Sequence, residues 1–399
     1  MVTVAAAPLR TRRGPGFTLA LAAVVAMMIG ASAPSPFYPV LQQELGFSAA
    51  TLTGIFAAYA VALLVAFLLT GSLSDHIGRR PVVSAGFVLL ALSMVVFWHA
   101  DSVRLLFTAR FVQGIATGLL MSSLSAAVVD LEPADRPGSA ATLNSISPLA
   151  GLAVGAAVAG ALLEYTSSAL AEVFGGLTAV YVLLAAAIWL LPETSERREG
   201  LVRSLTPRVG IPATARAPFL RSAPALSAGW ATGGLYLSLG APIVARELGR
   251  SNHLQQGLVV TVLTGSGALA CFAFRDQSAR RTTIFGTTAL AIGTTLTLLA
   301  LAAGSYWWFI AAAVVAGSGF GASFLGIMRS ITPAAAPHER GELFAAVFAV
   351  SYLAFGIPAV AAGIASPHLG LATTTFIYGG LVVALSGGAA LLRTFGSTD

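Results

Sequence analysis

The chain has 399 residues, of which 56% are hydrophobic and only 10% are charged, and its mean hydropathy is +0.84. An ordinary soluble domain carries roughly 25% charged residues, so this composition excludes a soluble protein of this length. It also excludes an intrinsically disordered chain, which would be poor in apolar residues. The long continuous apolar runs differ from the alternating segments of about ten residues in an outer-membrane barrel. The remaining class is an all-α polytopic membrane protein.

The apolar runs are long enough to span a bilayer, which takes about 20 residues in a helix. The first run, 17–41, follows basic residues as in a signal peptide, but it exceeds the 7 to 15 apolar residues of a signal core, so we expect it to be retained. Further runs begin near residues 49, 81, 105, 140, 173, 224, 254, 283, 306, 343 and 371. These patterns predict twelve transmembrane helices. The hydrophilic segment 192–222 divides them into an N-terminal six-helix bundle, 1–191, and a C-terminal six-helix bundle, 223–399.

All 22 basic residues are arginines, and against 16 acidic residues they give a formal net charge of +6. They lie in short connectors instead of on one domain, which argues against nucleic-acid binding. With a cytoplasmic N-terminus, the inner segments hold arginines 10, 12, 13, 79, 80, 136, 197, 198, 203, 208, 216, 221, 275, 280, 281, 329, 340 and 393. The outer loops then hold only arginines 104, 246 and 250. This asymmetry predicts that both termini are cytoplasmic.

The sequence also contains an internal repeat at a spacing near 200 residues. Segment 39–48 returns as 242–251 with the same Pro, Glu, Leu, Gly and Ser, segment 75–80 returns as 276–281, and segment 133–136 returns as 337–340. The order of the three matches is preserved. We therefore expect two pseudo-symmetric bundles in parallel orientation, an architecture that supports alternating access around a site near the membrane midplane.

The connector between the second and third predicted helices, 71–80, reads GSLSDHIGRR. It resembles the loop signature of the major facilitator superfamily, and the resemblance extends over essentially the whole chain. Arginines beyond the cytoplasmic end of a helix face the negative end of its dipole, Gly78 permits a tight turn, and Asp75 can pair with an arginine. The resemblance implies a conformational switch, formed by Asp75, Gly78, Arg79, Arg80 and Asp130, that locks the outward-open state. The alternative is a plain solvated loop that only sets topology.

Arg110 is the one ionisable residue clearly inside a predicted span, and Gln113 follows it one turn later. A centred arginine costs about 2.5–3.5 kcal/mol on insertion scales, so we expect compensation. The functional hypothesis is proton coupling or binding of an anionic group, with Glu164 as a further coupling candidate that could approach Arg104 or Arg110. The alternative is an arginine that extends to the outer surface.

The fifth predicted helix carries Pro148, Gly151 and Gly155. Small residues every four positions allow helices to approach closely and slide. The pattern is similar to a degraded form of the superfamily's antiporter motif, because the Gly before Pro148 is missing. The alternative is simple packing of small residues.

In the implied fold, polar and aromatic residues of several helices would line a substrate cavity: Ser35, Tyr38, Tyr59, Asn144, Trp230, Tyr236 and Tyr352. No acid is among them, which favours apolar, weakly polar or anionic substrates. Each of these residues could instead be structural, because Ser and Thr hydroxyls readily bond to their own helix. The lack of a carboxylate at the membrane centre leaves the proton carrier open.

We therefore expect a monomeric secondary transporter of the bacterial inner (plasma) membrane that exports small hydrophobic or weakly polar compounds in exchange for protons. Its partners would be the small-molecule substrate, protons and the lipid bilayer. The alternative is proton-coupled uptake of a small organic anion. A membrane enzyme would need buried catalytic acids or a metal cluster, and Cys271 is alone in an apolar run, so we expect no enzyme, no metal and no cofactor. Short loops argue against a receptor or scaffold.

Overall fold

The computed structural model describes residues 13–197, 199–207, 209–336 and 338–395, and every regular element in these ranges is helical. Arginines 10, 12, 198 and 208 of the charge pattern lie outside the described residues. The N-terminal half contains α1 (Arg13–Ser32), η1 (Ser35–Phe37), α2 (Tyr38–Leu45), α3 (Ala49–Thr70), α4 (Leu73–Ile77), α5 (Arg79–Trp98), α6 (Val103–Asp130), α7 (Ser139–Tyr165), η2 (Ala171–Gly175), α8 (Gly176–Ala187) and η3 (Ile188–Leu190).

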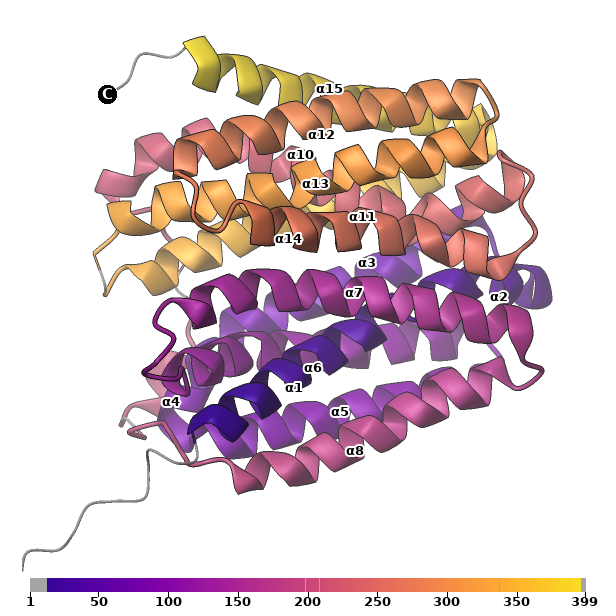
Figure 1. Ribbon diagram of the computed structural model, residues 1–399. Coiled ribbons are helices and arrows are strands. Elements are labelled where there is room, and N and C mark those ends of the chain that lie inside the picture. The colour runs from indigo at the N-terminus through magenta and orange to yellow at the C-terminus, as the bar shows by residue number, and fades with distance from the viewer. Residues whose placement is uncertain (1–12, 198, 208, 337, 396–399) are drawn as a thin grey trace, which may run out of the picture.

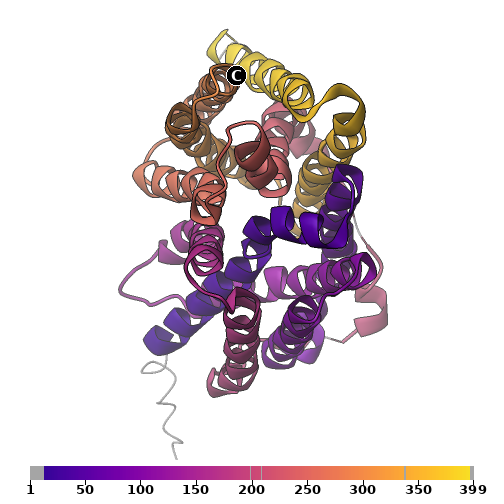
Figure 2. The ribbon, with the colours of Figure 1, turned by 90° about the vertical axis from the view of Figure 1, so that its right-hand side faces the viewer.

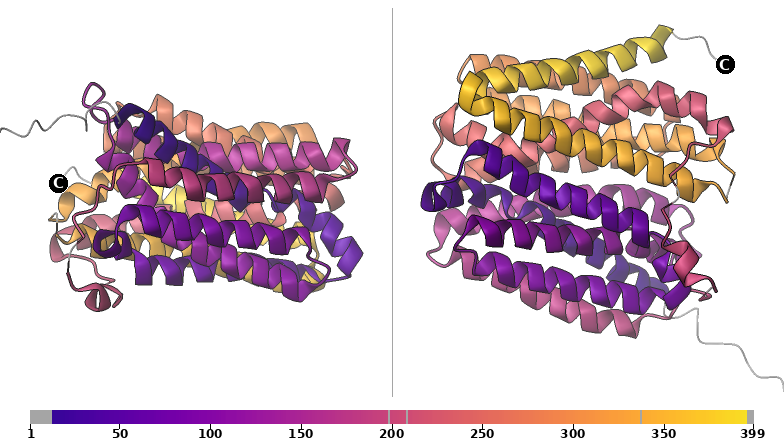
Figure 3. Two further views of the ribbon diagram at one scale, coloured as in Figure 1. Left: turned by 90° about the horizontal axis from the view of Figure 1, so that it is seen from below. Right: turned by 180° about the vertical axis from the view of Figure 1, so that it is seen from behind.

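The C-terminal half follows the same plan after the short helix α9 (Leu201–Ser204). Its elements are α10 (Ala213–Arg246), α11 (His253–Ala273), α12 (Ala279–Ala302), α13 (Tyr306–Ile331), η4 (Thr332–Ala334), α14 (Arg340–Leu369) and α15 (Leu371–Phe395). Figures 1 and 2 show the two halves as separate helical bundles side by side, and the reverse view in Figure 3 shows the same division.

Eleven helical stretches in the described ranges are long and apolar enough to cross a membrane, the first being the combined stretch Gly14–Leu45. The twelfth long helix is α10, which is not one of these eleven stretches and contains Pro218, Pro224 and Pro242. It packs against α11, α13, α14 and α15 in the C-terminal bundle, and most of its second half is buried. The predicted fold, a twelve-helix polytopic membrane protein, is confirmed.

Two details differ from the predicted elements. The first predicted run is broken, because Pro34 and Pro36 lack the N–H groups that an uninterrupted helix needs, and a single turn, η1, stands between α1 and α2. The helix α10 begins at Ala213, inside the segment 192–222 that we expected to be a linker. Pro218 and Pro224 lie within this helix, so the helix starts before the position near residue 224 that the sequence pattern predicted.

The two ends of the helical body differ in charge. One end carries α4, α9, the start of α1 and the end of α15 (Figure 1), together with the connectors in which arginines are concentrated; we call it the arginine-rich face. The opposite end carries α2 and the connectors 99–102, 247–252 and 303–305; we call it the arginine-poor face.

Candidate functional site

A cavity of about 1700 Å³ lies between the two bundles and takes lining residues from both of them. Its titratable lining residues other than tyrosine and cysteine lie in connectors, in α4, or in the last or first turn of a helix: Asp75, His76, Asp130, Glu199, Arg329, His338 and Glu342. All of these positions belong to the arginine-rich face. The cavity therefore opens at that face and extends inward to side chains in the middle of the spans, such as Tyr59 and Trp230.

At the arginine-poor face the two bundles are in contact. The helices α7 and α11 cross so closely that a Cβ atom added to Gly257 would lie 2.6 Å from the carbonyl oxygen of Ala156. Beyond this crossing, Glu164 Oε2 accepts a 2.7 Å hydrogen bond from the backbone N–H of His253, the first residue of α11. A carboxylate at a helix N-terminus is stabilised by the unpaired N–H groups and the dipole of that helix. The contact therefore joins the end of α7 to the start of α11.

Further polar contacts close the same end. Arg246 Nη2 donates to Gln42 Oε1 at 2.8 Å, and Ser35 Oγ donates to the carbonyl oxygen of Leu237 at 3.0 Å. Each of these bonds joins the N-terminal bundle to the C-terminal bundle. In contrast, each ion pair among the described residues joins two residues of the same bundle, and none connects the two bundles. The arginine-poor face is thus held closed by hydrogen bonds and close packing instead of by ion pairs.

A second crossing, between α3 and α14, flanks the cavity. Gly363 packs directly on Thr53, where any side chain on the glycine would overlap the threonine. Nearer the arginine-rich face, Phe67 stacks edge-on against Phe348 with ring centroids 4.9 Å apart. Edge-to-face aromatic pairs are favourable at this spacing, so the crossing is an apolar contact that stays intact while the cavity is open.

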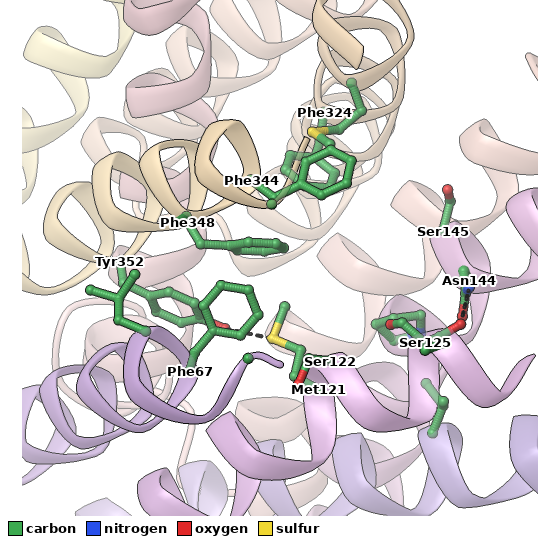
Figure 4. Close-up of a pocket in the computed structure, with 18 of the residues that line it drawn as sticks. Phe67, Met121, Ser122, Ser125, Asn144, Ser145, Phe324, Phe344, Phe348 and Tyr352 are labelled. Carbon is green, nitrogen blue, oxygen red and sulfur yellow. Dashed lines mark hydrogen bonds between the residues drawn. The ribbon is translucent and has the colours of Figure 1, made fainter. Parts of the chain in front are cut away.

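One side of the cavity is aromatic (Figure 4). Trp230 of α10 contacts four rings from α13 and α14, with centroid distances of 4.9 Å to Tyr352, 5.9 Å to Phe324, 6.0 Å to Phe355 and 6.5 Å to Phe348. All five residues line the cavity. We call these five residues the aromatic wall.

The facing side comes from α6 and α7 of the N-terminal bundle and carries small polar side chains (Figure 4). It consists of Ser122, Ser125, Asn144 and Ser145, which all line the cavity; we call it the polar wall. Asn144 Nδ2 donates to the carbonyl oxygen of Ser125 at 3.2 Å, so α7 is tied to α6 at this point.

Four of the seven cavity residues expected from the sequence line the cavity, namely Tyr59, Asn144, Trp230 and Tyr352. The other three do not, and the expectation was wrong for each of them. Ser35 and Tyr38 lie in the closed end, in and beside the turn that breaks the first span. Tyr236 points toward α12, where its hydroxyl bonds Thr297 Oγ1 at 3.0 Å. The spacing of these residues along the sequence does not indicate whether their side chains point into the cavity.

The predicted charge cluster at the arginine-rich face is present. Arg79 Nη1 donates to Asp75 Oδ1 at 2.7 Å, and Arg79 Nε donates to Asp130 Oδ2 at 2.9 Å. Arg79 is therefore shared by the connector that follows α3 and the end of α6. The side chain of Arg80 lies outside these ion pairs. We call Asp75, Arg79 and Asp130 the Arg79 cluster.

Glu193, which the sequence analysis did not select, completes this site. Its two carboxylate oxygens accept the backbone N–H groups of Arg79 (2.8 Å) and Arg80 (3.2 Å) at the start of α5. Gly78 has a φ of +107°, and a side chain there would meet the Glu193 carboxylate. Thr194 adds a hydrogen bond to Asp130 Oδ2 at 2.8 Å. The segment after η3 thus caps α5, a role that only the folded chain reveals because Glu193 is far away in sequence.

Arg110 is fully buried, which excludes the alternative in which it reaches the surface. Its Nε donates to the hydroxyl of Tyr38 at 2.6 Å, and its Nη1 donates to Gln113 Oε1 at 2.8 Å and to the carbonyl oxygen of Ala31 at 3.1 Å. Its guanidinium also lies 5.4 Å from the ring centroid of Tyr59. Nη2 finds no hydrogen-bond partner among the residues that the structure describes. Carbonyl, amide and aromatic groups therefore compensate this cation, and no carboxylate among the described residues pairs with it.

The remaining predicted residues lie at helix contacts. The carboxylate of Glu164, which the sequence analysis considered able to approach Arg104 or Arg110, instead bonds the other bundle at His253. Pro148 lines the cavity. Gly151 and Gly155 pack α7 directly against α1 of the same bundle, next to Met28 and Ile29 respectively. The small residues of α7 that face α11 of the other bundle are Ala153, Ala156 and Gly160.

Comparisons with known proteins agree with this architecture. The sequence profile of the Major Facilitator Superfamily matches residues 20–276. The uncharacterised transporter YebQ of Escherichia coli is 27% identical over 205 residues, which cover 51% of this chain and 43% of YebQ. The quinolone resistance protein NorA of Staphylococcus aureus is 23% identical over 107 residues, which cover 27% of this chain and 28% of NorA. The chain thus matches less than half the length of each relative.

A solved structure shares the whole fold. It is the xylose transporter XylE of Escherichia coli in a partially occluded inward-open conformation, and it superposes with a TM-score of 0.75. The superposition covers 97% of this chain and 98% of XylE at 14% sequence identity. At this identity the likeness concerns the fold alone.

Proposed function

The chain belongs to the major facilitator superfamily of membrane transporters, and we propose that it exports small hydrophobic or weakly polar compounds in exchange for protons. The observation that carries this proposal is the cavity between two repeated bundles, open at one face and closed at the other. A site between repeats that is accessible from one face at a time is the basis of alternating access. Rocking of the bundles about the α3–α14 and α7–α11 crossings would expose the cavity alternately.

The direction of transport rests on the orientation of the chain. The positive-inside rule assigns the arginine-rich face to the cytoplasm, so the open cavity would load substrate from inside the cell. The similarity to NorA, which is named a quinolone resistance protein, supports export of drug-like compounds. The alternative of anion uptake has less support, because it relied on Arg110, and this residue is committed to Tyr38, Gln113 and Ala31 instead of lining the cavity.

Proton coupling needs a group that exchanges a proton during the cycle. Arg110 is the only charged residue among the buried described residues, so carboxylates near the two faces are the remaining candidates. We propose Glu164 for this role, because its carboxylate joins the two bundles and would lose most of its hold on α11 when protonated. Asp75 and Asp130 at the other face are held by Arg79 within one bundle.

Transport by the purified chain in proteoliposomes tests the proposal. With the arginine-rich face outward and the vesicle interior acidic, we expect uncharged aromatic compounds to move from the bath into the vesicle against their gradient. Dissipating the pH gradient should abolish accumulation. Movement in the opposite direction would support uptake, and accumulation that ignores the pH gradient would contradict proton exchange.

A further inference from the structure

The two walls of the cavity differ in what they offer a ligand. The aromatic wall presents the rings around Trp230, whereas the polar wall presents hydroxyl and amide groups from α6 and α7. Figure 4 shows Phe324, Phe348 and Tyr352 on one side of the cavity, with Asn144 and Ser145 on the other. A ligand that fills the space between them would meet π faces on one side and hydrogen-bonding groups on the other.

The polar wall contains an acceptor that the protein leaves unpaired. Asn144 Nδ2 donates to the carbonyl oxygen of Ser125, and because a carbonyl can only accept, this bond fixes the orientation of the amide. Among the described residues Asn144 Oδ1 is then left without a hydrogen-bond partner, and Ser122 Oγ of the same wall also has none. Leaving a buried acceptor unpaired is unfavourable. A ligand with an N–H or O–H group would supply the missing donor.

The aromatic wall contains one unpaired donor and one weakly paired donor. Within the described part of the chain Trp230 Nε1 has no hydrogen-bond partner, and the Tyr352 hydroxyl donates only to the sulfur of Met121 at 3.6 Å, a weak acceptor. A carbonyl oxygen on the ligand would match these groups. The rings themselves favour a flat partner, because stacked and edge-on arrangements both need a planar π system.

Charge in the cavity is confined to its mouth. The charged lining residues all belong to the arginine-rich face, and between the two walls the lining side chains are uncharged. An ion that moved between the walls would lose its hydration without meeting a counter-ion, which is costly in an apolar site. The interior therefore discriminates against ions of either sign.

From these observations we propose that the cavity selects uncharged, planar aromatic compounds that carry an N–H donor beside a carbonyl acceptor, bound between Trp230 and Asn144. The proposal deepens the export function and rests on it for the identification of this cavity as the substrate site. It assigns stacking to the aromatic wall and recognition of the donor to the polar wall.

The test compares matched ligands on the unaltered full chain in nanodiscs, by equilibrium binding. Phenanthridinone is planar and uncharged and has the N–H and the carbonyl side by side. We expect it to bind about tenfold more tightly than its fully saturated analogue, which keeps the ring skeleton but has no planar π system, and about tenfold more tightly than the N-methylphenanthridinium cation. Its N-methyl derivative, which lacks the donor, should bind about three- to tenfold more weakly. Equal affinity for the saturated analogue, or tighter binding of the cation, would overturn the proposal.

Variants assign the two walls separately. Trp230→Ala should weaken binding of phenanthridinone and of its N-methyl derivative by a similar factor of about ten. Asn144→Leu should weaken binding of phenanthridinone alone, so that the two ligands become equivalent. Trp307→Ala is the matched control, because Trp307 is 65% exposed on the outer surface of α13, and it should change neither affinity. An Asn144→Leu protein that still prefers the N–H ligand would contradict the role given to Asn144.

The binding measurement tests the ligand preference and the transport measurement tests the export function, so either proposal can be contradicted while the other stands. Gradient-driven export of compounds without this preference would overturn the selectivity and leave the export function standing. Selective binding without any gradient-driven movement would contradict the export function while the ligand class remained supported.

Discussion

Replacing Glu164 with glutamine removes one negative charge from the start of α11 and leaves the size of the side chain unchanged. The wild-type carboxylate accepts the His253 N–H at 2.7 Å, across the boundary between the bundles. A carboxylate at a helix N-terminus contributes about 0.3–1 kcal/mol at an exposed site and up to about 2 kcal/mol when partly buried. Glu164 is half-buried, so we expect a loss of about 1–2 kcal/mol. That loss shifts the balance between closed and open forms of the arginine-poor face by about five- to thirty-fold.

Distances between spin labels at the arginine-poor face measure this shift. Labels at Asp101 and Ala303, which are exposed in connectors of opposite bundles, would be placed on a Cys271→Ala background. We expect Glu164→Gln to raise the population with the longer distance. The closed form should remain detectable, because the Arg246 and Ser35 contacts between the bundles persist.

Glu172→Gln provides the matched control, because Glu172 is an exposed acid near the same face of the N-terminal bundle. It should leave the distance distribution unchanged. Identical distributions for Glu164→Gln and the wild-type chain would refute the reasoning, since the charge would then contribute nothing to closure. Equal shifts in both variants would point to a general charge effect instead of a contact at α11.

Three further predictions concern the helix crossing, the Arg79 cluster and the buried arginine. Gly257→Ala should separate α7 from α11 and lengthen the same label distance, whereas Gly265→Ala, where the nearest atom lies at 3.7 Å, should not. Asp75→Asn should lower the transport rate at equal expression, with a stability change within about 1 kcal/mol because the Asp75 side chain is 40% exposed; an unchanged rate would remove the cluster from the switching mechanism. Arg110→Ala should lower the free energy of unfolding by about 2–4 kcal/mol because several buried acceptors lose their donor. Normal transport by this variant would exclude a functional role for Arg110.

The spans could be predicted from the sequence because apolar length and arginine placement are local properties. The starts expected near residues 49, 105, 306 and 371 lie within two residues of the starts of α3, α6, α13 and α15. The break at η1 was missed although Pro34 and Pro36 were visible. Hydropathy does not depend on whether a residue has a backbone N–H group, so the apolar run 17–41 was predicted to be one helix.

The site was predictable only in part, for a physical reason. The Arg79 cluster could be anticipated because segment 71–80 resembles the loop signature of the superfamily, which implies a charge cluster of Asp75, Arg79 and Asp130. Glu193 could not, since its approach to Arg79 depends on how the chain returns after η3. Likewise the direction of Tyr236, toward α12 and away from the cavity, depends on the rotation of α10 within its bundle.

The reciprocal movement of the two faces tests alternating access most directly. One label pair, Asp101 and Ala303, reports on the arginine-poor face. A second pair, Ile77 and Arg340, lies on opposite bundles, each residue next in sequence to one that lines the cavity. When a pH gradient or Glu164→Gln lengthens the first distance, we predict that the second distance shortens in the same molecules. Simultaneous lengthening of both distances, or movement at one face with the other unchanged, would contradict alternating access.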